Sequence, residues 1–281
     1  MALPDCLITG GAGQLARDLA RLLPLSVTLT REELSVTDLG KVRERIDREG
    51  AKLVFNCAAY NAVDRAEQEP EIAFAVNSEG AANVARACRL AGARLVHFST
   101  NYVFAGDGAD PNAEGDTPRP RSAYGRSKLE GELRALEELP DALVIRSSGL
   151  FGHGGSAIKG GNFPERLLAR AAAGERLAVV SDQRLNPTYT AHLAVASIAA
   201  AESGETGLLH LVAAGCCSFH EFAQEVLRVA GVDSAVEAIE TPAGGAERPR
   251  NGCLASTRAK PLSPWQAGLR EYWAARATSR V

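Results

Sequence analysis

The sequence predicts an α/β protein built on a doubly wound parallel sheet, with a small lobe formed by its C-terminal part. Short apolar runs alternate with helical stretches throughout the first half of the chain. The runs are almost continuously hydrophobic, which is typical of parallel strands covered by helices on both faces. Strands that alternate with helices imply βαβ units with right-handed crossovers, and therefore a single parallel sheet.

Five apolar runs in the first half are the predicted strands, at residues 6–9, 26–29, 53–59, 95–99 and 143–146. Four segments between them carry apolar residues at three- and four-residue spacing, the pattern of helices with one buried face. These predicted helices lie at residues 15–23, 39–49, 71–91 and 124–139. We expect residues 1–150 to form the sheet domain.

The second half is less regular. A Gly-rich stretch at 149–161 precedes predicted helices at 162–173, 190–202, 219–230 and 264–275, predicted strands at 177–180 and 208–212, and a loop at 241–251. Ser218 is a good N-cap for the third of these helices. We expect residues 151–281 to form most of a small substrate-binding lobe that is interleaved with the sheet domain.

Composition limits the classes of partner. Of the 281 residues 46% are hydrophobic and 23% charged, which is enough apolar material for a sizeable core. The net charge of −3 argues against nucleic acid or an anionic membrane surface as the main partner. No apolar run approaches the roughly 20 residues that span a bilayer, and the N-terminus lacks the features of a signal peptide. We therefore expect a cytoplasmic protein.

The six cysteines are irregularly spaced and include no CxxC pair, so neither a zinc ribbon nor a dithiol redox site is indicated. Cys6, Cys57 and Cys88 fall in apolar runs, as reduced core cysteines do. Adjacent Cys216 and Cys217 predict a turn, because neighbouring cysteines bridge only with strain. The sequence indicates no metal site.

A glycine-rich turn follows the first predicted strand, in the order Thr9-Gly10-Gly11-Ala12-Gly13-Gln14-Leu15-Ala16. Glycine permits a tight strand-to-helix turn and lets backbone N–H groups approach a diphosphate at the helix N-terminus. At this position in a βαβ series, the turn predicts a dinucleotide site of the Rossmann type.

The end of the second strand bears on which dinucleotide binds. An Asp or Glu there would bond the ribose 2′-hydroxyl and repel a 2′-phosphate. The strand instead ends Leu29-Thr30-Arg31, and a guanidinium pairs well with phosphate. We expect NADPH as the cofactor, with NADH as the alternative because Glu32 and Glu33 follow at once.

Tyr124 and Lys128 lie four residues apart and therefore on one face of a predicted helix. Thr100 ends the fourth predicted strand, at the edge where parallel sheets gather their active sites. These groups form a proton-transfer set. The ammonium and the nicotinamide cation lower the pKa of the phenol, which gives its proton to a carbonyl oxygen as hydride reaches the carbon. Lys128 would also hold the nicotinamide ribose, and Thr100 would bond the reacting oxygen.

With these residues, the chain resembles the extended short-chain dehydrogenases/reductases, and within them the dTDP-4-dehydrorhamnose reductase family. The resemblance rests on GGAGQLARDL from Gly10, NCAAYNAVDRAEQEP from Asn56, HFSTNYVFAGDG from His97, YGRSKLEGE from Tyr124, DQRLNPTY from Asp182 and ERPRNGCL from Glu247. The matching stretches occur in family order over nearly the whole chain.

The resemblance implies roles for further residues. It assigns Thr100, Tyr124 and Lys128 to catalysis, and it places Gly10, Gly13, Gln14, Leu15, Ser35, Val36, Cys57, Ala58, Ala59, Phe98 and Ser99 beside the cofactor. It implies substrate contacts for Thr100, Asn101, Gly149, Asn162, Phe163, Thr188, Tyr189 and Arg248. A homodimer is also possible.

Three positions depart from the family pattern. Asn101 replaces the usual Asp after Ser-Thr, which removes a carboxylate beside the reacting carbonyl but keeps a hydrogen-bonding side chain. Gly149 replaces an aromatic residue that packs the sugar, so we expect an enlarged or reshaped pocket. Ser35 replaces an Asp that usually meets the adenine. Asp18 matches one acidic residue of a magnesium site found in some members, which is too little to predict a metal.

The sequence thus predicts NADPH-dependent reduction of the C4 ketone of a nucleotide-linked 4-keto-6-deoxyhexose, most simply dTDP-4-dehydro-L-rhamnose or a related deoxysugar. A regulatory nucleotide-binding subunit, similar to the β subunit of methionine adenosyltransferase, is the alternative, since an Asn at the position of Asn101 also occurs there. An epimerase is weaker, because the stretch at 58–67 marks the reductase branch.

Overall fold

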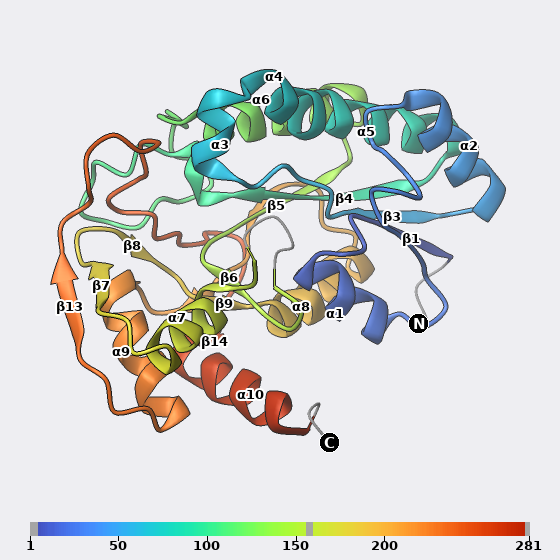
Figure 1. Ribbon diagram of the computed structural model, residues 1–281. Helices are drawn as coiled ribbons and strands as arrows, with labels where there is room; N and C mark the ends of the chain where they lie inside the picture. Colours follow the sequence, from blue (N-terminus) through green and yellow to red (C-terminus); the bar gives the residue numbers. More distant parts are fainter. Residues whose placement is uncertain (1–4, 156–159, 279–281) are drawn as a thin grey trace.

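A six-stranded parallel sheet lies at the centre of the molecule (Figure 1). The computed structural model describes residues 5–155 and 160–278. In spatial order the strands are β10 (Gly207–His210), β5 (Leu143–Ser147), β4 (Arg94–Thr100), β3 (Leu53–Asn56), β1 (Cys6–Thr9) and β2 (Val27–Leu29). The strand order reverses between β1 and β3, because β2 lies on one side of β1 and β3, β4, β5 and β10 lie on the other.

Helices cover both faces of this sheet (Figure 1). On one face lie α1 (Gln14–Leu22) and α8 (Thr190–Glu202), and on the other α2 (Leu39–Glu49), α5 (Gly80–Ala91) and α6 (Ala123–Glu138). Successive residues of one strand serve both layers: Ile8 packs with the α1 and α8 side chains, and Leu7 with those of α2 and α5. Both faces are therefore apolar, and the predicted doubly wound fold is confirmed.

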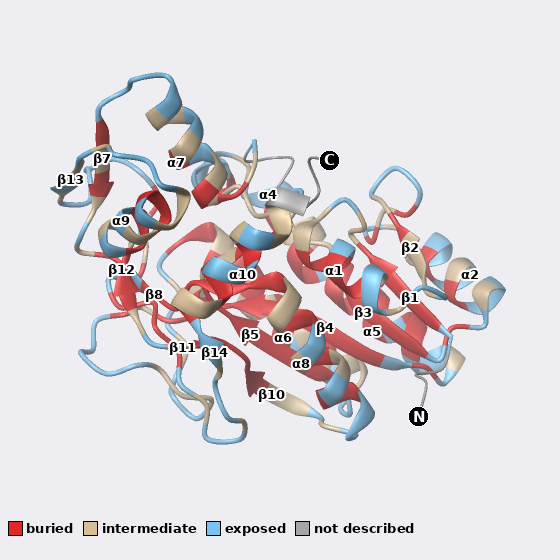
Figure 2. Ribbon diagram, turned by 90° about the horizontal axis from the view of Figure 1, so that it is seen from below, coloured by how far each residue is buried: buried red, intermediate tan, exposed pale blue. Residues whose placement is uncertain are grey.

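A second group of elements has its own hydrophobic core, which includes Phe222 and Trp265. It comprises α7 (Phe163–Ala172), α9 (Phe219–Ala230), α10 (Trp265–Thr278) and the parallel pair β7 (Leu177–Val180) and β13 (Val236–Ile239). Figure 2 shows it beside the buried strands of the sheet. Because α8 and β10 follow residue 150 yet belong to the sheet layers, the two groups are interleaved in sequence; the division into two domains stays a prediction.

Three short strand pairs were not predicted. They are β6 (Leu150–Phe151) with β9 (Thr188–Tyr189), β8 (Arg184–Leu185) with β12 (Cys217–Ser218), and β11 (Ala213–Ala214) with β14 (Leu262–Pro264). Two-residue strands leave no periodic pattern in a sequence. The predicted N-cap is confirmed, since Ser218 and Glu221 form a reciprocal capping box at the start of α9.

Two predicted elements end differently. The strand predicted at 53–59 stops at Asn56, after which a short α3 (Val63–Gln68) follows. The helix predicted at 71–91 is three pieces: α4 (Pro70–Phe74), the π-helical turn η1 (Ala75–Glu79) and α5. Asn77, in the π turn, exchanges hydrogen bonds with the backbone of Tyr60 and donates to Ser127 Oγ. No helix in the described part of the chain is long and apolar enough to cross a membrane.

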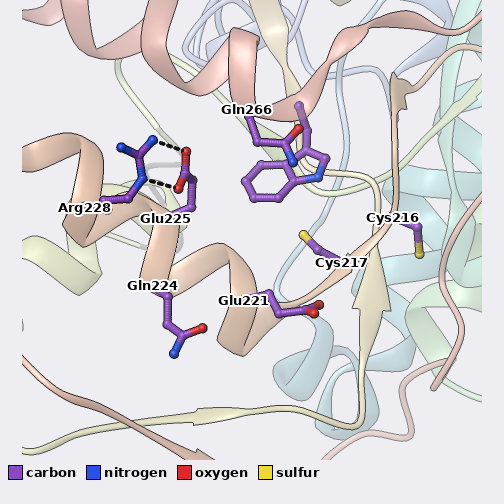
Figure 3. A pocket seen from close by; sticks show the side chains of 8 residues that line it. Cys216, Cys217, Glu221, Gln224, Glu225, Arg228 and Gln266 are labelled. Atoms are coloured by element: carbon purple, nitrogen blue, oxygen red, sulfur yellow. Dashed lines mark hydrogen bonds and ion pairs between the residues drawn. The ribbon is translucent and has the colours of Figure 1, made fainter.

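The cysteines are only partly as expected. Cys6, Cys57, Cys88 and Cys217 form no disulfide, but Cys216 forms one with Cys253. Figure 3 shows the sulfurs of Cys216 and Cys217 pointing apart, beside a hollow between α9 and the start of α10. Cys216 and Cys217 thus form no bond with each other. The bond from Cys216 to Cys253, 37 residues away, was not predicted.

Candidate active site

The predicted catalytic residues meet where β4 ends and α6 begins. Thr100 closes β4 and caps the short turn η2 (Asn101–Val103), with its hydroxyl accepting from Tyr102 N at 3.2 Å. Ser122 caps α6 by accepting from Gly125 N at 3.1 Å. A Cβ at residue 125 would overlap Tyr102 O. A glycine is therefore needed there for the helix to approach η2 closely.

Tyr124 carries its proton at neutral pH. Burial raises the pKa of its phenol to about 12, although a hydrogen bond with the Thr100 hydroxyl acts in the opposite direction. Its ring meets Tyr102 edge-on, with centroids 5.4 Å apart. In the protein alone, desolvation dominates this pKa, and its lowering by Lys128 together with a nicotinamide cation stays a prediction. A protonated phenol bonded to Thr100 is a proton donor.

Lys128 lies one turn further along α6, and its side chain is buried. Its Nζ donates to Phe98 O at 2.7 Å and lies 3.4 Å from His97 Nε2. Burial lowers the pKa of Lys128 to about 8, against the opposing effects of Glu132 and Cys57. The ammonium is therefore held against β4, close to the predicted cofactor strand.

The glycine turn between β1 and α1 has little free space. Gly10 has φ +69°, and a Cβ there would lie 2.7 Å from the backbone of Cys57 and Ala58. Gly13 is the N-cap of α1, and no side chain caps this end of the helix. Gln14 donates to Leu150 O at 3.1 Å, while its buried Oε1 has no partner among the described residues. Uncapped N–H groups at this helix end fit a dinucleotide diphosphate.

The remaining predicted cofactor residues surround this turn. Cys57, Ala58, Ala59 and Phe98 are partly exposed, and Leu15 packs into the core beneath α1. Ser99 differs from expectation, since its hydroxyl donates to the buried Glu132. That hydroxyl is therefore engaged in the protein interior.

The end of β2 leaves Arg31 exposed. Glu33 accepts from Thr30 N at 2.8 Å, and this bond lowers the pKa of its carboxyl. Ser35 bonds Thr37 through their hydroxyls, and Val36 is buried beside Gly80. One of the two acids after Arg31 is thus tied to the backbone.

Two predicted substrate residues reach the catalytic end of the sheet. Asn101 Nδ2 donates to Gly252 O at 3.0 Å. Arg248 pairs with Asp64 at 2.6 Å and also bonds the Tyr102 hydroxyl, which the sequence did not single out. The loop predicted at 241–251 therefore returns to η2 and brings a guanidinium beside Tyr102.

Other predicted substrate residues have their polar groups engaged elsewhere. Asn162 caps α7 and donates to Gly152 O at 2.7 Å and to Tyr272 Oη at 3.0 Å. Thr188 is fully buried between Asn186 O and Ala213 N. Phe163 and Tyr189 pack in the second core, against rings that include Phe219 and His192. These four residues stabilise the second group of elements, and their contact with substrate stays a prediction.

Gly149 corrects another expectation. Its φ is +60°, and a Cβ would lie 2.7 Å from Leu185 Cδ1 and 2.8 Å from Asn186 O. The place of the missing aromatic side chain is filled by the chain at 185–187, so Gly149 does not enlarge a pocket. Left-handed backbone with this contact favours glycine at residue 149.

The site is supported by buried groups that the sequence analysis missed. Glu132 and Arg146, each 1% exposed, form an ion pair beneath Ser99, and the Arg146 guanidinium lies over the Phe104 ring. Asn56 bonds His97, which contacts Lys128. The only sequence signal was the spacing of Glu132, four residues after Lys128 on one helix face.

The acidic residue considered for magnesium is engaged in local contacts. Asp18 accepts from Thr190 Oγ1 at 2.6 Å and pairs with Arg21 at 3.3 Å. Among the residues that the structure describes, no three His, Cys, Asp or Glu side chains form a group suited to a metal ion.

Comparison with known proteins decides the family. The family model described as the RmlD substrate binding domain matches residues 5–277. The chain belongs to this family, that of the dTDP-4-dehydrorhamnose reductases. It is therefore an oxidoreductase of the extended short-chain dehydrogenase/reductase type.

Relatives of this family member extend over almost its full length. A dTDP-4-dehydrorhamnose reductase of Streptomyces griseus is 38% identical, over 97% of this chain and 94% of the relative. A dTDP-4-keto-6-deoxy-D-glucose reductase of Streptomyces niveus is 37% identical, over 87% of this chain and 86% of the relative. These two relatives are therefore both named as reductases, but of different sugars.

Solved structures of the family superpose closely. A dTDP-4-dehydrorhamnose reductase of Clostridium acetobutylicum has a TM-score of 0.92 at 31% identity, covering 98% of this chain and 100% of its own. The enzyme of Bacillus anthracis, in complex with NADP, has a TM-score of 0.91 at 30% identity, covering 96% and 99%. Epimerases at 18% identity or below share the fold alone.

Proposed function

We propose that this family member uses NADPH to reduce the C4 ketone of a nucleotide-linked 4-keto-6-deoxyhexose, dTDP-4-dehydro-L-rhamnose or a related deoxysugar. The observation that carries the proposal is the buried phenol of Tyr124, protonated at neutral pH and bonded to Thr100. The names of the relatives support a keto-sugar nucleotide as substrate.

The chemistry divides between cofactor and protein. When bound, the nicotinamide supplies the hydride. Tyr124 gives its phenolic proton to the new alkoxide, and Thr100 bonds the same oxygen and fixes the carbonyl beside the phenol. Lys128 would hold the cofactor ribose. Arg248, beside Tyr102, provides a positive charge suited to the substrate diphosphate.

The experiment follows NADPH oxidation by absorbance, with enzymatically generated dTDP-4-keto-6-deoxy sugars and the Tyr124→Phe variant as control. We expect turnover in the wild type and its loss in the variant, and product NMR then identifies the sugar. Equal turnover by both proteins would contradict the role of Tyr124. Tight NADPH binding without turnover on any such sugar would favour the regulatory-subunit alternative.

Arg31 supports the choice of NADPH. Its exposed guanidinium follows β2, where a 2′-phosphate would lie in this fold, and Glu33 is turned to Thr30 N. We expect Arg31→Ala to weaken NADPH binding and leave NADH binding nearly unchanged. The matched control is Arg43→Ala, which removes an exposed guanidinium on α2. Equal wild-type affinity for the two cofactors, or tighter binding of NADH, would overturn the preference for NADPH.

The cytoplasmic location and the homodimer stay predictions.

A further inference from the structure

A line of buried polar side chains crosses the sheet beneath the catalytic residues. Thr9 Oγ1 lies 2.7 Å from Asn56 Oδ1, Asn56 Nδ2 lies 3.1 Å from His97 Nδ1, and His97 Nε2 lies 3.4 Å from Lys128 Nζ. The first three residues are each 1% exposed, as is Lys128. The line starts on β1, passes through β3 and β4, and ends at the amine.

The direction of these hydrogen bonds is fixed by one backbone group. Ala58 N lies 3.3 Å from the Asn56 amide and can only donate, so it identifies the Asn56 oxygen. The other end of the amide is then NH₂, which also can only donate. His97 Nδ1 must therefore accept, and it carries no proton.

The proton of a neutral His97 ring is consequently on Nε2. Burial holds the pKa of His97 well below its usual range, and the charge of Lys128 acts in the same direction, so the ring is neutral. An Nε2–H group directed at Lys128 is a donor facing an amine. Such a contact suits the neutral amine, which has a lone pair, and opposes the ammonium, which has only donors.

The other groups around Lys128 also affect the balance between its charged and neutral forms. Phe98 O accepts from the amine in either protonation state. Glu132 on the same helix and Cys57 after β3 favour the charged form, and burial disfavours it. Tyr124, one turn earlier on α6, is neutral. Among these neighbours, His97 is the one whose effect depends on which ring nitrogen carries the proton.

We propose that Asn56 locks His97 in the Nε2–H tautomer, and that His97 thereby directs a donor at Lys128 and favours its neutral amine. Asn56 and His97 are positioning residues, since both act on the reaction through Lys128. The kinetic consequence rests on the proposed function, but the tautomer does not.

The first test is NMR of ¹⁵N-histidine-labelled, full-length protein, because ring ¹⁵N shifts separate protonated from unprotonated nitrogens. His210 is an internal reference with the opposite tautomer. Its Nδ1 lies 2.8 Å from Ala255 O, which can only accept, so that ring must carry its proton on Nδ1. We expect two buried neutral histidines in opposite tautomers, assigned with His97→Gln and His210→Gln. A proton on Nδ1 of His97, or an imidazolium, would overturn the proposal.

The second test reverses the direction of the hydrogen bond between residue 56 and the His97 ring. In Asn56→Asp, the carboxylate still accepts from Ala58 N and Thr9 Oγ1 and now also accepts from the ring, so the His97 proton should move to Nδ1. The matched control, Thr9→Val, removes one bond to Asn56 but leaves Ala58 N in place, and it should keep the wild-type tautomer. An unchanged tautomer in Asn56→Asp, or a changed one in Thr9→Val, contradicts the assignment.

The third measurement is the pKa of Lys128, from ¹³C NMR of ε-labelled lysine assigned with Lys128→Met. We expect His97→Phe, which removes the N–H, to raise this pKa by about one unit and to move the alkaline limb of kcat/KM by the same amount. No change in the pKa would overturn the proposed effect on the amine. A raised pKa without any ketoreductase activity would leave the inference standing and refute the proposed function.

Discussion

Asn101 and Gly252, 151 residues apart, are joined by a hydrogen bond next to Thr100. The Asn101 Nδ2 donates to Gly252 O, and a Cβ at residue 252 would overlap the same nitrogen. Ser148 Oγ also donates to this carbonyl, at 3.1 Å. The position that usually carries an acid in the family is thus a donor in this protein, and its partner is a carbonyl.

Asn101→Asp is therefore expected to destabilise the protein, although it restores the family residue. A carboxylate would face the Gly252 carbonyl with no hydrogen to donate. We expect a loss of about 1–3 kcal/mol in the free energy of unfolding, measured by denaturant titration at neutral pH. Asn101→Ser, which keeps a donor, is the milder control. Unchanged stability in Asn101→Asp would show that the Gly252 contact contributes little.

Tyr124→Phe should lower kcat by about 10²–10⁴-fold, because only the proton donor is lost. The ring contact with Tyr102 needs no hydroxyl, so the fold and the cofactor Kd should be nearly unchanged. Single-turnover kinetics and cofactor titration by fluorescence measure the two quantities. A variant that loses cofactor binding as well would place the phenol in cofactor recognition.

Lys128 should make stability depend on pH in the alkaline range. Its pKa is about 8 in the folded protein against 10.5 for an ordinary lysine, so the unfolded chain binds more protons between these values. The free energy of unfolding therefore rises from pH 8 to 10.5, by on the order of 3 kcal/mol from this group alone. Chemical unfolding of the wild type and Lys128→Met across this range measures the difference, which should be largest below pH 8, where the variant is the more stable. A pH-independent difference would argue against a shifted lysine.

The buried Glu132–Arg146 pair should behave as a unit. Glu132→Leu leaves a guanidinium unpaired in the interior and is expected to cost about 3–5 kcal/mol. The double variant Glu132→Leu/Arg146→Met removes both charges and should recover most of that loss. A double-mutant cycle of unfolding free energies measures the coupling. Additive losses would indicate that the two charges are separately solvated.

Gly149→Ala should destabilise the protein by about 1–3 kcal/mol, since φ is +60° and the methyl group meets Asn186 O. Gly149→Trp should fail to improve turnover of dTDP-4-keto-rhamnose, because the tryptophan has no open space to enter. Thermal unfolding and the ketoreductase assay test the two statements. Gly174→Ala is the control, since its φ is +69° but no atom lies near its Cβ position.

Hydrophobic continuity predicted the sheet and most helices, because runs such as β1 and β3 are buried on both faces by the fold itself. The glycine turn and the Tyr124–Lys128 spacing could also be predicted, because their chemistry depends on the order of residues close together in the chain. The contacts between Asn56, His97 and Lys128 were not readable, because they join separate elements through single side chains. Nor was the role of Gly149, whose neighbours come from residues 185–187.

Asn162 and Thr188 have partners within the fold that the sequence did not reveal. Both match positions that the resemblance assigns to substrate, yet one caps a helix and the other bridges two backbone segments. A sequence match preserves the residue type but does not reveal which of its hydrogen-bonding atoms are already paired within the fold.

The π turn at Ala75–Glu79 makes the length of this helical segment a constraint in its own right. Such a turn holds one residue more than a regular helix would need over the same rise. Deleting a single residue between α4 and α5 would let the segment become one continuous α-helix, with the turns on either side still in register. The widened turn that holds Asn77 against Tyr60 and Ser127 would be lost. Homologous chains that keep this active site should therefore tolerate substitutions in this segment far better than single-residue deletions.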